Sequence, residues 1–262
     1  MLTIREPWPS EATLVRALLP QACGDPGGRR FLLAFEASGS VAGAASWLEE
    51  GPGRYGVAIE VVPSKRRRGI GSRILEALGP GELKATAPDA AAPFLEARGF
   101  KRTGGQTTVE AELDYVVAAL RGFPEVPELR EGAVDPIAVA LLYRRWIVGD
   151  EQLPEALTAA RLLSDPGLKI FTATRDAQVR AFLMWRRQGE LVTVEAWASD
   201  PAVRGTALNT GLLVGFVRQL HAAGARRARF SWGDPVIQTP RLARRFAARE
   251  VGRAGFWTRH SL

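Results

Sequence analysis

The chain has 262 residues, of which 46% are hydrophobic and 24% are charged, a composition that is typical of globular proteins and excludes a largely disordered one. Its apolar runs are too short to span a bilayer, the N-terminus shows no signal-peptide pattern, and the one cysteine, Cys23, excludes an intramolecular disulfide and a cysteine-based metal cluster. The net charge of +7, carried mostly by arginine, leaves three explanations open: a solvated surface, an anionic cofactor and, least favoured because the arginine pairs are scattered, nucleic acid.

Hydrophobic periodicity predicts an α/β layer in the first 113 residues. Ala37-Ser38-Gly39-Ser40 separates two strand-like runs and is a hairpin signal. Gly79-Pro80-Gly81 and Gly99-Phe100 each end a helix. We therefore expect a mostly antiparallel mixed sheet flanked by helices, an α/β (α+β layered) fold. In chain order, the predicted elements are a strand at Leu2–Pro7, a helix from Pro9, strands at Phe31–Glu36, Val41–Leu48 and Tyr55–Val62, a helix that carries Ile70, Ile74, Leu75 and Leu78, a strand at Leu83–Ala87, a helix at Ala90–Arg98 and a strand around Thr107–Leu113.

The second half of the sequence repeats features of the first. This repetition predicts two copies of one domain, with chance agreement among common residues as the alternative. We expect the boundary within Asp114–Glu131, where a glycine and two prolines interrupt the pattern, and so assign residues 1–113 and 114–262 to two domains. Helices are predicted at Pro136–Ile147 and Pro154–Leu163. The pairs Val41 and Val179, Trp47 and Trp185, Pro63 and Pro201, and Arg66 and Arg204 are each separated by 138 positions.

The segment Val61–Ser72 carries the clearest chemical signal. A strand runs into a basic loop that contains Gly69 and Gly71, and a helix follows. Glycine lets the backbone approach a bulky phosphate, and the first turn of a helix offers unpaired amides with a partial positive charge. Because Arg66–Arg68 add positive charge beside that turn, the segment predicts a pyrophosphate-binding loop rather than a basic turn without a ligand.

This segment resembles the acetyl-CoA signature of the GNAT (N-acetyltransferase) superfamily, R/Q-x-x-G-x-G/A, with Arg66, Gly69 and Gly71 in the fixed positions. Phe94–Phe100 resembles the family's later F-Y-E-x-x-G-F segment, so the resemblance covers essentially all of residues 1–113. It implies that acetyl-CoA or another acyl-CoA binds with its pantetheine arm on strand amides and its pyrophosphate on loop amides. The implied cofactor-binding residues are Val61, Val62, Arg66, Arg67, Arg68, Gly69, Ile70, Gly71 and Ser72.

Two departures from the family pattern bear on mechanism. Leu95 stands where the family often has a tyrosine that protonates the leaving thiolate, so this role is vacant or belongs to another group, such as Tyr55 or water. In the second copy, Ala207 and Asn209 replace the two loop glycines, and we expect this half not to bind acetyl-CoA in the usual way. The chain thus resembles a tandem GNAT protein with one competent and one degenerate half.

A carboxylate is the candidate catalytic base, because acyl transfer to an amine requires the neutral amine. Glu60 precedes the signature on its strand, and Glu195 occupies a comparable strand in the second copy; an exposed or ion-paired structural glutamate is the alternative for both. With His221 and His260 as the only histidines, we expect no metal site. We expect a cytoplasmic acetyl-CoA-dependent N-acyltransferase that acts on a small-molecule amine or a peptide or protein amine, without a membrane or nucleic-acid partner. The alternatives are a non-catalytic CoA-binding or scaffold protein and a nucleic-acid-associated protein.

Overall fold

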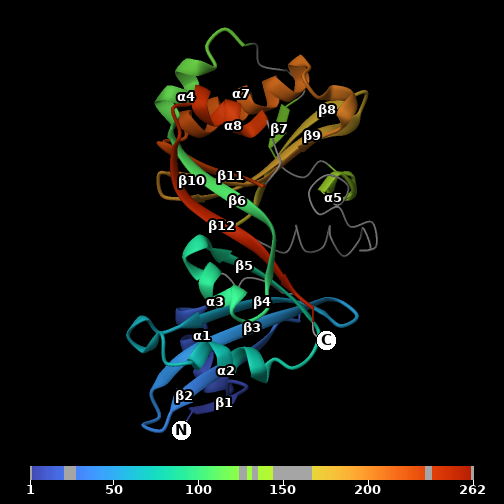
Figure 1. The fold of residues 1–262 in the computed structure, drawn as a ribbon. Coiled ribbons are helices and arrows are strands. Elements are labelled where there is room, and N and C mark those ends of the chain that lie inside the picture. Colours follow the sequence, from blue (N-terminus) through green and yellow to red (C-terminus); the bar gives the residue numbers. More distant parts are fainter. Residues whose placement is uncertain are drawn as a thin grey trace. The chain divides into compact units, whose positions relative to one another are not determined.

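A computed structural model describes residues 2–20, 28–123, 129–131, 135–143, 167–233 and 238–260 (Figure 1). The chain divides into two compact units, one made of Met1–Gln106 with Arg253–Leu262 and the other of Thr107–Gly252. The C-terminal segment, which the sequence analysis assigned to the second domain, thus lies in the first unit. The predicted boundary after residue 113 lies close to the division at residues 106 and 107. The assignment of residues 1–113 and 114–262 to two domains stays a prediction.

The first unit is built on a sheet with the strand order β1-β2-β3-β4-β5-β12. Its strands pair antiparallel except β4 and β5, which are parallel. β12 comes from the C-terminal end of the chain, and its pairing with β5 explains why that segment lies in this unit. The elements are β1 (Leu2–Arg5), η1 (Pro9–Glu11), α1 (Ala12–Leu18), β2 (Arg30–Glu36), β3 (Val41–Gly51), β4 (Arg54–Val61), η3 (Pro63–Lys65), α2 (Ile70–Ala77), β5 (Glu82–Pro88), η4 (Asp89–Ala91), α3 (Ala92–Glu96), the beginning of β6 (Lys101–Glu112) and most of β12 (Arg249–Arg259).

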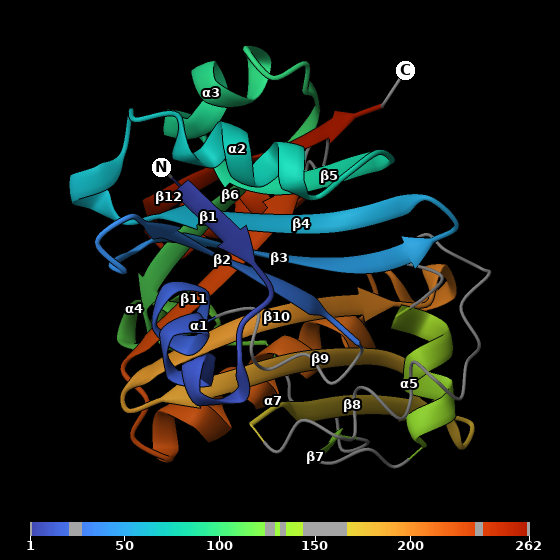
Figure 2. The same ribbon diagram turned by 90° about the horizontal axis from the view of Figure 1, so that it is seen from below.

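Helices cover both faces of this first sheet (Figure 2). Side chains alternate along a strand, so neighbouring residues of β2 serve two different cores. Leu33 packs with Val15 of α1, whereas Leu32 packs with Ile74 of α2. A further cluster includes Leu95 of α3. The predicted fold class, a layered α/β arrangement with a mostly antiparallel mixed sheet, is confirmed.

The second unit has the strand order β6-β11-β10-β9-β8-β7, again with one parallel pair, β10 and β11. Phe216 of α7 anchors its core with edge-on contacts to Phe171 and Trp185. The predicted helix at Pro136–Ile147 is found as α5 as far as Tyr143, and Pro154–Leu163 lies outside the described residues. Within the described residues, no helix has both the length and the apolar character that crossing a membrane requires. The elements are α4 (Leu113–Ala119), β7 (Leu129–Glu131), α5 (Pro136–Tyr143), β8 (Lys169–Arg175), β9 (Gln178–Gln188), β10 (Leu191–Ser199), η6 (Pro201–Val203), α7 (Ala207–Ala222), β11 (Arg227–Gly233) and α8 (Gln238–Arg245).

The two units repeat one order of elements. The short helices η3 and η6 begin 138 positions apart, and each follows the first strand of the parallel pair in its unit. A cross-strand cation also recurs over the matched indoles: Arg30 lies 5.0 Å from the ring centroid of Trp47, and Lys169 lies 5.2 Å from that of Trp185. The sequence repeat therefore corresponds to a repeat of structure, which includes the matching cation–indole pairs.

Candidate functional site

The strands β4 and β5 separate shortly before the predicted cofactor segment, which begins at Val61. They pair in parallel over Arg54–Val57 and Glu82–Ala85, and among the described residues their pairing ends there. β4 continues through Ala58–Val61 and stays paired with β3 on its other edge. The edge of this second half of β4 that faces β5 therefore has backbone groups that a bound ligand can satisfy.

The loop between β4 and α2 contains two residues in the left-handed backbone conformation. Arg67 and Gly69 have φ angles of 64° and 76°, and Gly69 is the N-cap of α2. This conformation suits glycine and strains a residue that carries a Cβ. Because Gly69 has no side chain to cap them, the amides in the first turn of α2 are donors for an anion.

Gly71, in the first turn of α2, lies against the ring of Phe94. A Cβ at this position would come 3.2 Å from Phe94 Cζ and 3.7 Å from Val61 Cγ2. The side chains of its neighbours Ile70 and Ser72 are buried, so these two residues can reach a ligand through their amides alone. The helix start thus presents backbone rather than side chains.

The amide of Val62, which the resemblance assigns to the pantetheine arm, is already engaged. Val62 N donates a hydrogen bond to Ala42 O at 3.0 Å, and Val62 O accepts one from Lys65 N at 2.8 Å. Both bonds fix the point where the loop leaves the sheet. The contacts of the cofactor arm with Val61 and Val62 stay a prediction.

Carboxylates hold the basic side chains of the loop in place. Glu36, at the end of β2, binds Lys65 Nζ through Oε2 at 2.9 Å and Arg68 Nη1 through Oε1 at 2.8 Å. Lys65 Nζ also donates to Ser40 Oγ at 2.6 Å and to Val41 O at 2.9 Å, which leaves its side chain 15% exposed. The β2–β3 hairpin therefore anchors the loop, a role that the sequence analysis did not identify.

The anchoring contacts also affect the charge state of Glu36. The hydrogen bond from Lys65 lowers the pKa of Glu36, and the hydrogen bond from Ser40 lowers it further, whereas desolvation raises it. The net shift is downward, so Glu36 keeps its negative charge beside two loop cations.

Glu60, the predicted base, forms an ion pair with a residue of the signature. Its Oε1 lies 2.7 Å from Arg66 Nη2, and Arg66 Nε donates to Val61 O at 3.1 Å. The Glu60 side chain is 40% exposed. The ion-paired structural role that the sequence left open is thus present, and the catalytic role stays a prediction.

Leu95, at the family's tyrosine position, and Tyr55, the side chain considered for the acid in its place, belong to one apolar cluster. Leu95 is 5% exposed and packs in the core with Val57 and Phe100. Tyr55, at the far end of β4, packs against Gly81, where a Cβ would come 2.7 Å from its ring. Proton donation to a leaving thiolate by a tyrosine at the family position is therefore excluded, because that position is apolar core.

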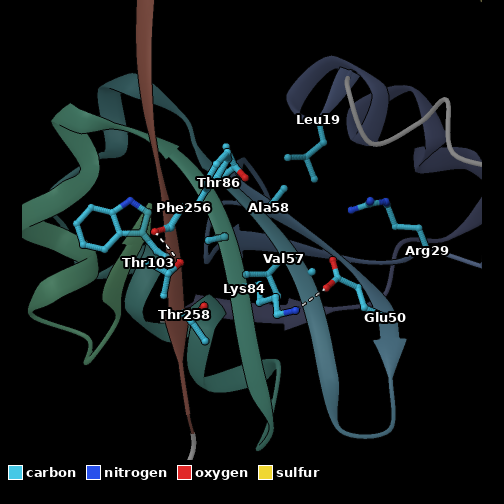
Figure 3. A pocket seen from close by; sticks show the side chains of 13 residues that line it. Leu19, Arg29, Glu50, Val57, Ala58, Lys84, Thr86, Thr103, Phe256 and Thr258 are labelled. Atoms are coloured by element: carbon cyan, nitrogen blue, oxygen red, sulfur yellow. Dashed lines mark hydrogen bonds and ion pairs between the residues drawn. The ribbon is translucent and has the colours of Figure 1, made fainter. Parts of the chain in front are cut away.

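A pocket of about 550 Å³ adjoins the gap between β4 and β5 within the first unit (Figure 3). Ala58 and Thr86 lie at one end, where the strands separate, and Glu50 and Lys84 lie at the other. Its lining comes from Leu19 after α1, from Arg29 before β2, and from β3, β4, β5, β6 and β12. These segments are far apart in sequence, so the sequence analysis could not assemble the pocket. Its place beside the strand gap makes it the candidate acceptor site.

The other candidate residues make contacts away from this arrangement. Glu195 pairs with Arg186 at 3.4 Å, and His221 Nε2 lies 2.6 Å from Asp114 Oδ1, both in the second unit. Cys23 lies outside the described residues. Within the described part of the chain, no three His, Cys, Asp or Glu side chains are grouped closely enough to hold a metal ion.

The matching loop of the second unit satisfies its own polar groups. Asp200 accepts a hydrogen bond from Ala202 N at 2.9 Å and pairs with Arg180 at 2.9 Å. Asn209, at the position of Gly71, accepts a hydrogen bond from Trp197 Nε1 at 3.2 Å. Side chains therefore occupy the start of this helix, in agreement with the expectation that this half is degenerate.

No protein-family model and no curated protein sequence matches the chain. Its structure does match solved structures. A tandem GNAT protein from the clavulanic acid biosynthesis pathway aligns over 98% of this chain and 98% of its own, with 17% identity and a TM-score of 0.74. A GCN5-related N-acetyltransferase from Sphaerobacter thermophilus aligns over 98% and 95%, with 15% identity and a TM-score of 0.68. A putative acetyltransferase from Pyrococcus horikoshii aligns over 100% and 90%, with 17% identity and a TM-score of 0.67.

These alignments run through both units rather than one. The resemblance inferred from Arg66, Gly69 and Gly71 is thereby confirmed at the level of the fold. The chain has the fold of the GNAT N-acetyltransferases, shared over nearly its whole length with a tandem member.

Proposed function

We propose that the first unit transfers an acetyl or other acyl group from acyl-CoA to an amine. The observation that carries this proposal is the coincidence of three features: the gap between β4 and β5, the loop with left-handed Gly69, and the pocket beside the gap. Acyl-CoA supplies an activated acyl group on a thioester. The acceptor is the amine of a small molecule, a peptide or a protein in the cytoplasm.

The loop residues would bind the cofactor by its phosphates. The first-turn amides of α2 would donate to a phosphate, and the helix dipole favours negative charge there. Glu36 and Glu60 orient Lys65, Arg68 and Arg66 before any ligand arrives. Preorganised donors lower the entropy that binding would otherwise cost.

Glu60 is the proposed general base for the incoming amine. Side chains alternate along β4, so Glu60 lies on the same face as Ala58, which lines the pocket. Removal of a general base typically lowers the rate by a factor on the order of 10²–10⁴. Glu60→Gln should therefore lower kcat strongly, and raising the pH should recover part of the loss. Acetyl-CoA affinity should fall by no more than about fivefold, through loss of the partly exposed ion pair with Arg66.

The ion pair with Arg66 provides the control for that experiment. If Glu60 serves only to orient Arg66, Glu60→Gln and Arg66→Gln should weaken acetyl-CoA binding alike and leave kcat at saturation unchanged. That result would remove Glu60 from the chemistry and leave water as the proton acceptor.

A non-catalytic CoA-binding protein is the second candidate, because Leu95 puts apolar core where a proton donor would be needed. Calorimetry with acetyl-CoA, followed by an assay of free CoA release with a panel of amines, separates the two. Binding with release supports transfer, and binding without release under all conditions supports the alternative. Absence of acetyl-CoA binding to the folded protein would overturn both.

A further inference from the structure

An ion pair lies at the end of the pocket that is remote from the strand gap. Lys84 Nζ is 3.5 Å from Glu50 Oε2, and each side chain is 43% exposed. Both residues line the pocket, with Val57 between them and Thr86 (Figure 3). The remote end therefore presents one positive and one negative group to whatever occupies the pocket.

The position of Glu50 depends on two backbone features. β3 pairs Glu49 with Tyr55 and Gly51 with Arg54, so Glu50 is the extra residue of a β-bulge. A bulge redirects the side chain it carries. Across from it, a Cβ on Gly56 would come 2.5 Å from Glu50 Oε1, so the glycine leaves room for the carboxylate in its present position over β4.

The strand register sets the distance from this pair to the reacting centre. Gly56 lies opposite Lys84, and Thr258 of β12 lies opposite Lys84 on its other side. Ala58 and Thr86, where the strands separate, are two residues further along. Two residues of a strand span about 7 Å, so the ion pair lies about that far from the place where a thioester would meet its acceptor.

We propose that the acceptor is a diamino acid, acylated on its side-chain amine. Its α-carboxylate would bind Lys84, its α-ammonium would bind Glu50, and a chain of about four methylene groups would carry the second amine to the gap. Arg29, which donates to Ser46 Oγ at 3.2 Å, lines the same pocket and adds positive charge. A zwitterion complements the pair, whereas a single charge would leave one partner less well matched.

The reaction balances without a further reactant, and this inference rests on the proposed function. The bond between the acyl carbon and sulfur breaks as the bond between the acyl carbon and the side-chain nitrogen forms. The amine loses one proton, and the departing CoA thiolate gains one. The α-ammonium, held by Glu50, stays protonated and is not acylated.

Four amines with the same reacting end test the proposal. Free lysine carries both far groups, aminocaproate only the carboxylate, cadaverine only the ammonium, and pentylamine neither. We expect kcat/KM to be highest for free lysine, about tenfold lower for each singly charged amine, and on the order of a hundredfold lower for pentylamine.

Variants assign each preference to its residue. Glu50→Gln should remove the preference for free lysine over aminocaproate, and Lys84→Met should remove the preference over cadaverine. Gly56→Ala should reduce the same preference in part, because a Cβ 2.5 Å from Glu50 Oε1 forces the carboxylate to shift while its charge remains. Two surface changes serve as matched controls and should alter no preference, Glu49→Gln on β3 and Lys101→Met on β6.

The outcomes separate this inference from the function on which it rests. Equal turnover of pentylamine and free lysine overturns the inference and leaves acyl transfer intact. If no amine is turned over, calorimetry of free lysine with the acetyl-CoA-saturated protein decides: binding that Glu50→Gln and Lys84→Met each weaken about tenfold supports the pocket assignment, and no binding overturns it. If the protein does not bind acetyl-CoA at all, the proposed function itself is overturned.

Discussion

The loops that start α2 and α7 begin alike and end differently. Each follows a strand with a short 3-10 helix and then a left-handed residue, Arg67 with φ 64° in the first and Gly205 with φ 74° in the second. The first loop adds another left-handed residue, Gly69, and its helix starts after it. In the second loop Thr206 is the N-cap, in an extended conformation, and Ala207 already belongs to the helix.

The difference shows how two copies can share the fold while only one has the proposed cofactor site. In the second loop, Asp200 and Asn209 accept hydrogen bonds from Ala202 and Trp197, so the polar groups near the helix start are paired within the protein. In the first, glycines stand where side chains would be, and the basic residues are tied to the hairpin instead. Packing needs only the helix and sheet, whereas anion binding needs an open helix start.

The largest expected effect comes from a charge placed in the first loop. Gly71→Glu adds a negative charge and bulk at the proposed pyrophosphate position, and two like charges about 4 Å apart near a surface repel by about 4 kcal/mol, nearly a thousandfold in affinity. The fold should survive, because the added Cβ, 3.2 Å from the ring of Phe94, requires only a small shift of a ring that is 37% exposed. Calorimetry should show loss of acetyl-CoA binding.

The second loop supplies the matched control. Asn209→Glu should leave acetyl-CoA affinity unchanged, and the wild-type protein should bind one acetyl-CoA per chain. A stoichiometry of two, or unchanged affinity in a folded Gly71→Glu variant, would contradict the difference between the loops.

A smaller effect is expected from the left-handed glycines themselves. Gly69→Ala and Gly205→Ala each force a Cβ into a left-handed conformation, at φ 76° and 74°, and neither Cβ would meet another atom within 4 Å. Both should therefore lose about 1–2 kcal/mol of stability through backbone strain alone. Only Gly69→Ala should also weaken acetyl-CoA binding, by about tenfold, because it reshapes the amides of α2.

Thermal unfolding and calorimetry on the same two variants test this. Equal loss of stability with unequal loss of affinity supports the comparison. If Gly205→Ala weakened acetyl-CoA binding and Gly69→Ala did not, the cofactor site would lie in the second unit and the comparison would be wrong.

Local sequence features predicted the hairpin, the loop and the repeat, because each depends on residues close together in the chain. The turn at Gly39 has a positive φ of 80°, and the hairpin forms as expected. The addition of β12 to the first sheet is not local: Trp257 pairs opposite Ala85. No pattern in either segment specifies that partner, so the C-terminal segment was assigned to the second domain.

The site was likewise predictable only where it depends on local sequence. The glycines of the loop indicate its backbone conformation. Arg66 lies only six residues from Glu60, but no helix or strand period predicts that these two side chains form an ion pair. Glu36 and Lys65 are brought together by the hairpin, and Glu50 and Lys84 by a bulge and the strand register. Contacts of that kind follow from tertiary pairing, which one sequence does not specify.

The smallest expected effect concerns the carboxylates that organise the two loops, Glu36 in the first and Asp200 in the second. The hydrogen bonds from Lys65 and Ser40 lower the pKa of Glu36 in the folded protein. A carboxylate with a lowered folded-state pKa contributes stability above its unfolded-state pKa, and this contribution is lost as the pH falls through the folded-state pKa. Glu36→Gln should therefore be less stable than wild type near neutral pH, and the difference should vanish in acid.

Acetyl-CoA affinity separates the two carboxylates. Asp200→Asn weakens the ion pair with Arg180 in the loop that we expect not to bind acetyl-CoA, so it should change stability and leave affinity unchanged. Glu36→Gln should also weaken binding, by about two- to fivefold, because Lys65 and Arg68 lose the anchor they share. A gain in affinity would contradict this expectation and show that Glu36 competes with the cofactor for those cations, since freed cations would then bind phosphate better than anchored ones.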